Sequence, residues 1–243
     1  MTVERSVRVW HTVLLVLTLG SPVVAADPSP SEKWEKEIRV FEAADQQHPP
    51  PQQAILFIGS SGIRLWKTLA QDFPEHTVIN RGFGGSQIAD CVHFADRIVI
   101  PYQPRWIVLR AGTNDIQAGK TPEQVFADFT AFVEKVRAKL PDTPITFMSL
   151  NPSPARWANA QQEQRANQLI REYIAAHKQL DYLDTFTPML GADGKPREEL
   201  YVADRLHCTA AGYQLWTQLV RPHLPEARPK NTPLSPVRLL KKS

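Results

Sequence analysis

The sequence predicts an α/β fold, a three-layer α/β/α sandwich built on a five-stranded parallel sheet. Five short apolar runs recur along the chain, and segments with helical periodicity separate them. The runs are continuously apolar rather than alternating, which is typical of parallel strands that are covered on both faces. Because crossovers between parallel strands are right-handed, the intervening helices are expected to cover both faces of the sheet.

The first expected element is a helix over residues 31–47. Ser31 is a candidate cap, and Trp34, Ile38 and Phe41 share one face. Three prolines at residues 49–51 end it, because proline lacks the backbone donor that a helix needs. The strands are expected over residues 54–58, 77–80, 106–110, 144–150 and 180–183. The remaining helices are expected over residues 63–71, 88–98, 121–140 and 161–177, and the last opens within 204–213 and ends near 220.

The two ends of the chain differ in composition from this central part. Arg5 and Arg8 precede an apolar run at 13–19, and small residues follow at 20–26, which predicts a secretory signal peptide over 1–25. An uncleaved anchor is the alternative, but the run is shorter than the roughly 20 residues of a membrane span. We therefore expect an exported protein, periplasmic or extracellular, without stable membrane insertion after signal cleavage.

These features divide the chain into four parts. After the signal peptide we expect a linker with the N-terminal helix (26–51), a main domain (52–224) and a disordered tail rich in Pro, Lys and Arg (225–243). The formal net charge is only +3, and no basic cluster is interleaved with aromatic residues, so nucleic-acid binding is not expected. Cys91 and Cys208 are too few for a disulfide scaffold, and either one bridge or two separate buried thiols is compatible with them.

A hydroxyl-bearing turn follows the first expected strand. The apolar run ends at Gly59-Ser60-Ser61-Gly62, and a helical pattern begins at once. Such a turn lies at the carboxyl edge of the sheet and at the positive end of a helix dipole. Ser61 is therefore a candidate nucleophile, although a turn of Gly and Ser that only reverses the chain is the alternative.

Further polar residues follow other strands and are expected at the same edge. Gly85 and Asn114 follow strands two and three, and Asp204 and His207 follow strand five, spaced so that one helical turn would carry both. Serine hydrolysis needs a base and a carboxylate that orients it, and N–H donors that stabilise the oxyanion. Taken singly, Gly85 and Asn114 are also compatible with turns, Asp204 with a helix cap and His207 with a surface position.

Four segments together resemble the ordered blocks of the SGNH hydrolases, the GDSL-type esterases and lipases. The segments are Gly59-Ser60-Ser61, Asn80 to Ser86, Gly112-Thr113-Asn114-Asp115 and Asp204-Arg205-Leu206-His207, within a likeness that covers residues 52–224. The resemblance implies a flavodoxin-like fold and hydrolysis of carboxylic esters without a metal or organic cofactor. Ser61 would be the nucleophile, His207 the base and Asp204 its orienting carboxylate. Ser61, Gly85 and Asn114 would form the oxyanion hole.

The resemblance has one departure, because Ser60 stands where the family usually has aspartate. Gly-Ser-Ser is nevertheless familiar among similar sequences, so the departure leaves open only how the turn is hydrogen-bonded. By position, Ser61 rather than Ser60 matches the nucleophile.

The expected substrate is a small-molecule or saccharide ester with a short acyl group, in particular acetyl. No cap domain or long apolar insert is present to bury a fatty chain. In the loop at 151–157, Arg156 and Trp157 either bind the alcohol part of the substrate or only pack the rim. Three alternatives stay open: a transacylase using the same site, a non-catalytic carbohydrate-binding protein with this fold, and a metal hydrolase with Asp204 and His207 as ligands, which lacks a third nearby ligand.

Overall fold

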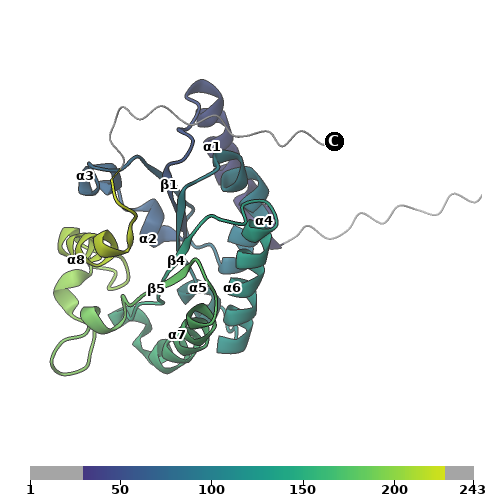
Figure 1. Cartoon of the computed structure of the whole chain (residues 1–243). Helices are drawn as coiled ribbons and strands as arrows, with labels where there is room; N and C mark the ends of the chain where they lie inside the picture. Colours follow the sequence, from purple (N-terminus) through teal and green to yellow (C-terminus); the bar gives the residue numbers. More distant parts are fainter. Residues whose placement is uncertain (1–29, 228–243) are drawn as a thin grey trace, which may run out of the picture. The chain divides into compact units, whose positions relative to one another are not determined.

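The computed structural model describes residues 30–227 (Figure 1). Its centre is a parallel five-stranded sheet in the order β2-β1-β3-β4-β5. The strands are β1 (Ile55–Gly59), β2 (Val78–Gly82), β3 (Trp106–Arg110), β4 (Ile145–Met148) and β5 (Leu180–Leu183). This confirms the predicted fold class and sheet. The predicted signal peptide and residues 228–243 of the predicted tail lie outside the described part of the chain.

The strand order places a topological switch beside β1. The chain pairs β1 with β2 on one side and with β3 on the other, and Gly59 lies opposite both Gly82 and Arg110 in register. In open α/β sheets, ligands bind outside the carboxyl ends of the strands at such a point. The turns that follow β1, β2 and β3 therefore meet at one edge of the sheet.

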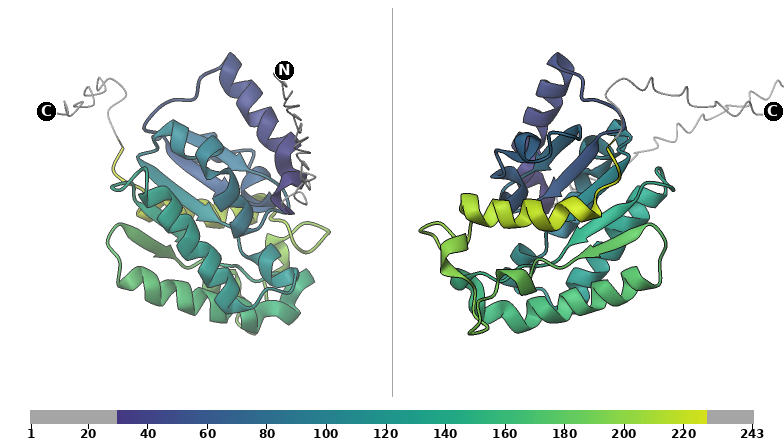
Figure 2. Two further views of the ribbon diagram at one scale, coloured as in Figure 1. Left: turned by 90° about the vertical axis from the view of Figure 1, so that its right-hand side faces the viewer. Right: turned by 60° about the vertical axis from the view of Figure 1, so that its left-hand side comes forward.

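Two helical layers cover the sheet (Figure 2). One contains α1 (Glu35–Gln47), α4 (Ile88–Ile98), α6 (Pro122–Arg137) and α7 (Ala160–Ala175), and the other contains α2 (Ser61–Arg64), α3 (Leu69–Asp72) and α8 (Ala210–Val220). A short helix, α5 (Thr113–Gln117), follows β3. Side chains of β1 alternate between the layers: Leu56 and Ile58 pack on the first, whereas Ile55 and Phe57 pack on the second. All four are fully buried, which explains the unbroken apolar run in the sequence.

The helix predicted over residues 63–71 is wrong, because two short helices replace it. After α2 the chain turns inward at Trp66, which is 1 % exposed and packs edge-on against Phe57. Trp66 Nε1 donates to Asp72 Oδ2 at 2.6 Å. Burial of this large side chain and its polar tip outweighs the local preference for one continuous helix.

The N-terminal helix packs as its apolar face predicts. Ile38 is buried, and Trp34 and Phe41 pack against the same core cluster. The predicted cap at Ser31 is wrong. The residue lies in a 3₁₀ turn, Pro30–Trp34, and its hydroxyl donates to Asp90 Oδ1 at 2.6 Å. Ser31 therefore links the N-terminal segment to α4.

The two cysteines lie on opposite faces of the sheet. Cys91 is buried in the first layer within α4, and Cys208 packs against the second cluster. Both thiols are free, which agrees with two separate thiols rather than one bridge. Among the described helices, none is both long and apolar enough to cross a membrane.

Candidate active site

The nucleophile candidate lies in a close-packed turn at the end of β1. Gly59 has a φ of 151°, and a Cβ there would lie 1.9 Å from the Arg110 carbonyl oxygen, so only glycine fits. The N–H of Ser60 donates to that same oxygen at 3.1 Å. Ser61 then begins α2, and its Oγ lies 2.9 Å from His207 Nε2.

The Asp204–His207 segment is a turn rather than the predicted helical turn. It precedes α8, whose cap is Thr209, and Arg205 adopts a left-handed φ of 58°. Asp204 Oδ1 accepts the N–H groups of Leu206 and His207, both at 2.9 Å. Asp204 Oδ2 lies 2.6 Å from His207 Nδ1. The short side chain of an aspartate reaches the backbone N–H groups that follow it. These hydrogen bonds favour a tight turn over a helix.

These contacts determine which nitrogen of His207 carries the proton. The backbone N–H of His207 and its side chain lower the pKa of Asp204 to about 2. An ionised carboxylate only accepts, so Nδ1 carries the hydrogen that it receives. Nε2 of the neutral ring is then an acceptor, and the Ser61 hydroxyl lies within its reach.

Of the three predicted oxyanion donors, Ser61 and Asn114 line one cavity, whereas Gly85 does not line it. Gly85 has a φ of 80° and is exposed, and none of the backbone hydrogen bonds within the described residues uses its N–H or that of Ser61. Asn114 Nδ2 donates to the Ser86 carbonyl at 2.9 Å, which leaves its second N–H available. The structure thus joins Asp204, His207 and Ser61 by hydrogen bonds and places Asn114 in the same cavity, while Asn114 contacts Ser86, the residue after Gly85.

Asp115 is a structural support that the sequence reasoning missed. It is fully buried, and its two carboxylate oxygens accept the Ile88 N–H at 3.3 Å each. Lys120 Nζ lies 3.1 Å from Oδ1. Asp115 therefore ties the turn after β3 to the start of α4, next to Gly85 and Ser86. Its place directly after Asn114 was the one available signal.

Arg110 was also missed, and it explains the serine at position 60. The side chain is 8 % exposed and lies over the Trp216 ring at 4.9 Å. Nη1 donates to Ser60 Oγ at 3.2 Å, and Nη2 donates to Asn151 Oδ1. These partners are neutral, and burial lowers the pKa of Arg110. Position 60 thus provides a hydroxyl acceptor for a buried guanidinium. An arginine at the end of an apolar strand was the signal in the sequence.

The two residues predicted on the loop after β4 differ in their placement. Arg156 Nη1 donates to Asn114 Oδ1 at 2.9 Å and reaches the Thr113 carbonyl at 3.4 Å. Trp157 is half-buried and does not line the cavity at Ser61. That cavity has a volume of about 20 Å³. Its walls are formed by Ser61, Gly62, Arg110, Thr113, Asn114, Arg156, Leu206, His207, Cys208 and Trp216.

Glu163 of α7 is a buried carboxyl behind this cavity. It is 1 % exposed, and its Oε2 has no hydrogen-bond partner. Burial raises its pKa to about 8, although the guanidinium groups of Arg110 and Arg156 act in the opposite direction. Burial therefore favours the protonated form of Glu163. Nothing in the sequence distinguished it from the other carboxylates of an amphipathic helix.

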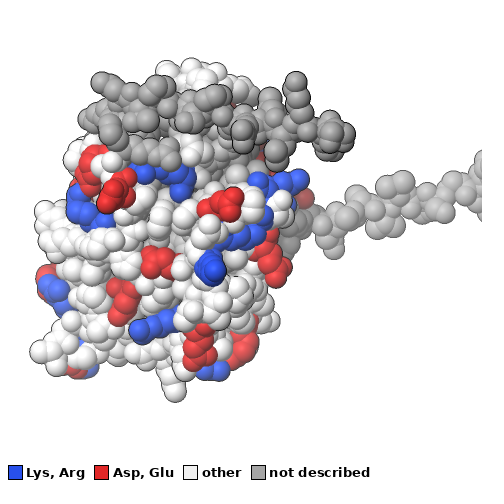
Figure 3. All heavy atoms as spheres, viewed as in Figure 1, with Lys and Arg blue, Asp and Glu red and all other residues white. Residues whose placement is uncertain are grey.

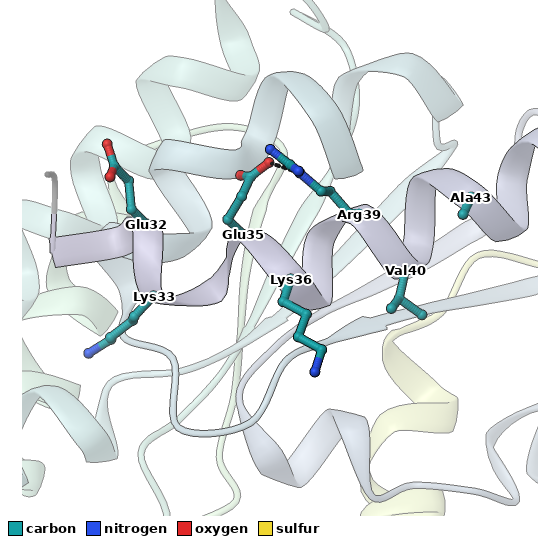
Figure 4. A pocket seen from close by; sticks show the side chains of 7 residues that line it. All are labelled: Glu32, Lys33, Glu35, Lys36, Arg39, Val40 and Ala43. Carbon is teal, nitrogen blue, oxygen red and sulfur yellow. Dashed lines mark hydrogen bonds and ion pairs between the residues drawn. The ribbon is translucent and has the colours of Figure 1, made fainter.

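Other surfaces lack this convergence. A larger, open hollow at α1 is lined, among the described residues, by side chains of residues 32–43 alone (Figure 4). Glu35 and Arg39 point toward each other there, 2.8 Å apart. On the face drawn in Figure 3, acidic and basic side chains are interspersed. Within residues 30–227, no group of three or more His, Cys, Asp and Glu side chains is placed to hold a metal ion.

Comparisons with known proteins place this site in context. Residues 40–215 match the model of the GDSL-like Lipase/Acylhydrolase family. The human platelet-activating factor acetylhydrolase IB subunit alpha1 is 28 % identical over 207 residues, which cover 80 % of this chain and 84 % of the relative.

Solved structures share the fold. A GDSL-like lipase from Bacteroides thetaiotaomicron superposes with a TM-score of 0.65 at 21 % identity, covering 76 % of this chain and 96 % of that one. For a mutant acetyl-xylooligosaccharide esterase from Geobacillus the TM-score is 0.57 at 15 % identity, with coverages of 74 % and 99 %.

Proposed function

Because the chain belongs to the GDSL-like lipase/acylhydrolase family and is a carboxylic ester hydrolase, we propose that it is an exported esterase. It removes short acyl groups, acetyl above all, through an acyl-enzyme on Ser61. The observation that carries the proposal is the continuous hydrogen-bonded chain from Asp204 through His207 to the Ser61 hydroxyl.

In the first half-reaction, Ser61 Oγ attacks the ester carbonyl carbon. Its proton passes to His207 Nε2, and Asp204 stabilises the imidazolium that forms. The carbonyl oxygen becomes an oxyanion, which accepts hydrogen bonds from the N–H groups of Ser61 and Gly85 and from the Asn114 amide. When the tetrahedral intermediate collapses, the bond to the alcohol oxygen breaks, and the alcohol leaves with the proton from His207.

In the second half-reaction, water replaces the alcohol. His207 takes one proton from the water while the water oxygen bonds to the acyl carbon. Collapse of this second intermediate breaks the bond to Ser61 Oγ, and the proton on His207 returns to that oxygen. The carboxylic acid is released, and Ser61 is regenerated for the next cycle.

The size of the cavity supports a short acyl group. Its volume of about 20 Å³ holds roughly one water-sized group. Leu206 and Trp216 contribute apolar surface to its walls, against which a methyl group can pack. One similar protein is named an acetylhydrolase and one similar structure an acetyl-xylooligosaccharide esterase, so an acetylated saccharide is the proposed substrate class.

The nucleophile is tested by comparing the wild type with the Ser61→Ala and Ser60→Ala variants. A fluorophosphonate probe should label the wild type and Ser60→Ala, whereas Ser61→Ala should remain unlabelled and lose roughly 10⁶-fold in kcat. Labelling of Ser61→Ala would overturn the assignment. Loss of wild-type activity in a chelator would favour the metal-hydrolase alternative.

The acyl preference and the transfer alternative need separate assays. Across nitrophenyl esters from acetyl to octanoyl, kcat/KM should be highest for acetyl, and a maximum at octanoyl contradicts the proposal. With an acetylated xylo-oligosaccharide, acetate release should equal deacetylation. Acetyl groups that reappear on an acceptor sugar instead would identify a transacylase.

Export is tested by the mature N-terminus. When the full chain is expressed in a bacterial host, mass spectrometry of the periplasmic or secreted protein should find it processed near Ala25 or Ala26. An intact N-terminus in the cytoplasmic fraction would overturn this part of the proposal.

A further inference from the structure

The amide of Asn114 is held at both of its ends. Nδ2 donates to the Ser86 carbonyl at 2.9 Å, and Oδ1 accepts from Arg156 Nη1 at 2.9 Å. The two ends of an amide have almost the same shape but opposite hydrogen-bonding character. A carbonyl can only accept and a guanidinium can only donate, so these two partners together select one orientation of the amide.

We propose that Arg156 is a positioning residue that keeps the Asn114 N–H directed at the oxyanion. If the amide rotated by half a turn, Oδ1 would face the Ser86 carbonyl and the oxyanion, and both contacts would be repulsive. Arg156 opposes that rotation because the flipped amide would present N–H groups to its guanidinium. The inference rests on the proposed role of Asn114 as an oxyanion donor.

The backbone next to Arg156 is held by the turn that carries Asp204 and His207. The N–H of Ala155 donates to the Arg205 carbonyl at 3.0 Å, and the N–H of Arg156 donates to the Ser153 carbonyl at 3.1 Å. Arg205 lies between Asp204 and His207, in the left-handed conformation that turns its segment. One contact therefore links the base-bearing turn to the arginine that orients the oxyanion donor.

The environment of Arg156 favours this role over pairing with a carboxylate. Its side-chain partners, the Asn114 amide and the Thr113 carbonyl, are neutral. Burial raises the pKa of Glu163, the nearby carboxyl group, which favours its neutral form. A charge-assisted hydrogen bond from the guanidinium to an amide oxygen is stronger than a neutral one.

The proposal is tested by steady-state kinetics on Arg156→Gln, with Arg165→Gln as the matched control. Arg165 is a half-exposed arginine on α7, 3.7 Å from Glu123 and outside the cavity. Arg156→Gln should lower kcat about 10-fold to 10²-fold, a fraction of the 10²–10³ lost with an oxyanion donor, while KM changes less than about 2-fold. Arg165→Gln should leave both unchanged. A thermal melt and labelling of Ser61 by the fluorophosphonate probe establish that each variant is folded.

A double-mutant cycle with Asn114→Ala separates the possible outcomes. Arg156→Gln should cost little more once Asn114 is already alanine, because its effect passes through that amide. Arg156→Lys, which restores a donor, should recover part of kcat. Additive losses, or a raised KM with kcat unchanged, would overturn the proposal and identify Arg156 as a substrate contact. If Asn114→Ala itself keeps full activity, the oxyanion role in the proposed function fails instead.

Discussion

The two halves of the active site are built in different ways. The base half is local: Asp204 and His207 are three residues apart, and the turn between them supplies most of their hydrogen bonds. Their side chains are 48 % and 27 % exposed. The oxyanion half joins turns after three strands and rests on fully buried groups such as Asp115. We therefore expect changes in the base half to affect chemistry alone, and changes in the support of the oxyanion half to affect stability as well.

Among changes to the groups that support Ser61 and the oxyanion, the largest effect is expected from Asp204→Asn, which removes the charge that orients His207. An amide in this place would allow the wrong tautomer, and kcat should fall roughly 10³–10⁴-fold. The thermal midpoint should change little, because the side chain is half-exposed and Asn can still accept the backbone N–H groups. A melt that shifts by many degrees would show that the base half is not the independent local unit described here.

Glu163→Gln should change stability in a pH-dependent way without changing kcat. The folded pKa of about 8 lies above the ordinary glutamate pKa of 4.5, so between these values the folded state binds more protons than the unfolded state. Wild-type stability therefore falls as pH rises through this window, and the variant lacks that loss. The free energy of unfolding of the variant, relative to that of the wild type, should increase by a few kcal/mol from pH 5 to pH 8, since one pKa unit is about 1.4 kcal/mol. Denaturant unfolding at both pH values measures it, and a constant difference contradicts the assignment.

Asp115→Ala should weaken the support of the oxyanion half. The variant leaves the buried Ile88 N–H without its acceptor and removes one anion from Lys120, which keeps Asp128. Unfolding free energy should fall by about 2–3 kcal/mol, and kcat should fall with it as the turn next to Gly85 loosens. Asp128→Ala serves as the control that removes only the half-buried second partner of Lys120. Equal effects of the two variants would contradict the role of Asp115 as a buried support of the oxyanion half.

The smallest effect is expected at position 60, where the family usually carries aspartate. Ser60→Asp puts a carboxylate beside the buried guanidinium of Arg110, whereas Ser60→Asn has the same size and no charge. The aspartate variant should be the more stable of the two by about 1 kcal/mol, because a buried cation gains an opposite charge. Thermal melts of both variants decide it, and a less stable aspartate variant would show that Arg110 is satisfied by its neutral partners.

The elements whose pattern is local could be predicted from the sequence. The helix Ile88–Ile98 and the strands Trp106–Arg110 and Leu180–Leu183 have the bounds that their apolar patterns predict. The helix predicted over 63–71 was wrong because the burial of Trp66 depends on packing against other elements, such as Phe57 of β1 and the distant Trp216 of α8. The prediction that Asp204 and His207 share one face of a helix was wrong, because the segment is a tight turn. The two side chains are nevertheless in contact, since residues three positions apart come together in a tight turn as well as in a helix.

The amino-acid sequence by itself determined the fold class, the succession of strands and helices along the chain, and which turns lie at the carboxyl edge of the sheet. These follow from local periodicity and from the rule that parallel strands end on the same side. Only the tertiary structure decided that Arg110 supports Ser60, that Asp115 holds α4 and that Arg156 faces Asn114. Each of these contacts joins residues more than 25 positions apart and depends on burial, which leaves no periodic trace in the sequence.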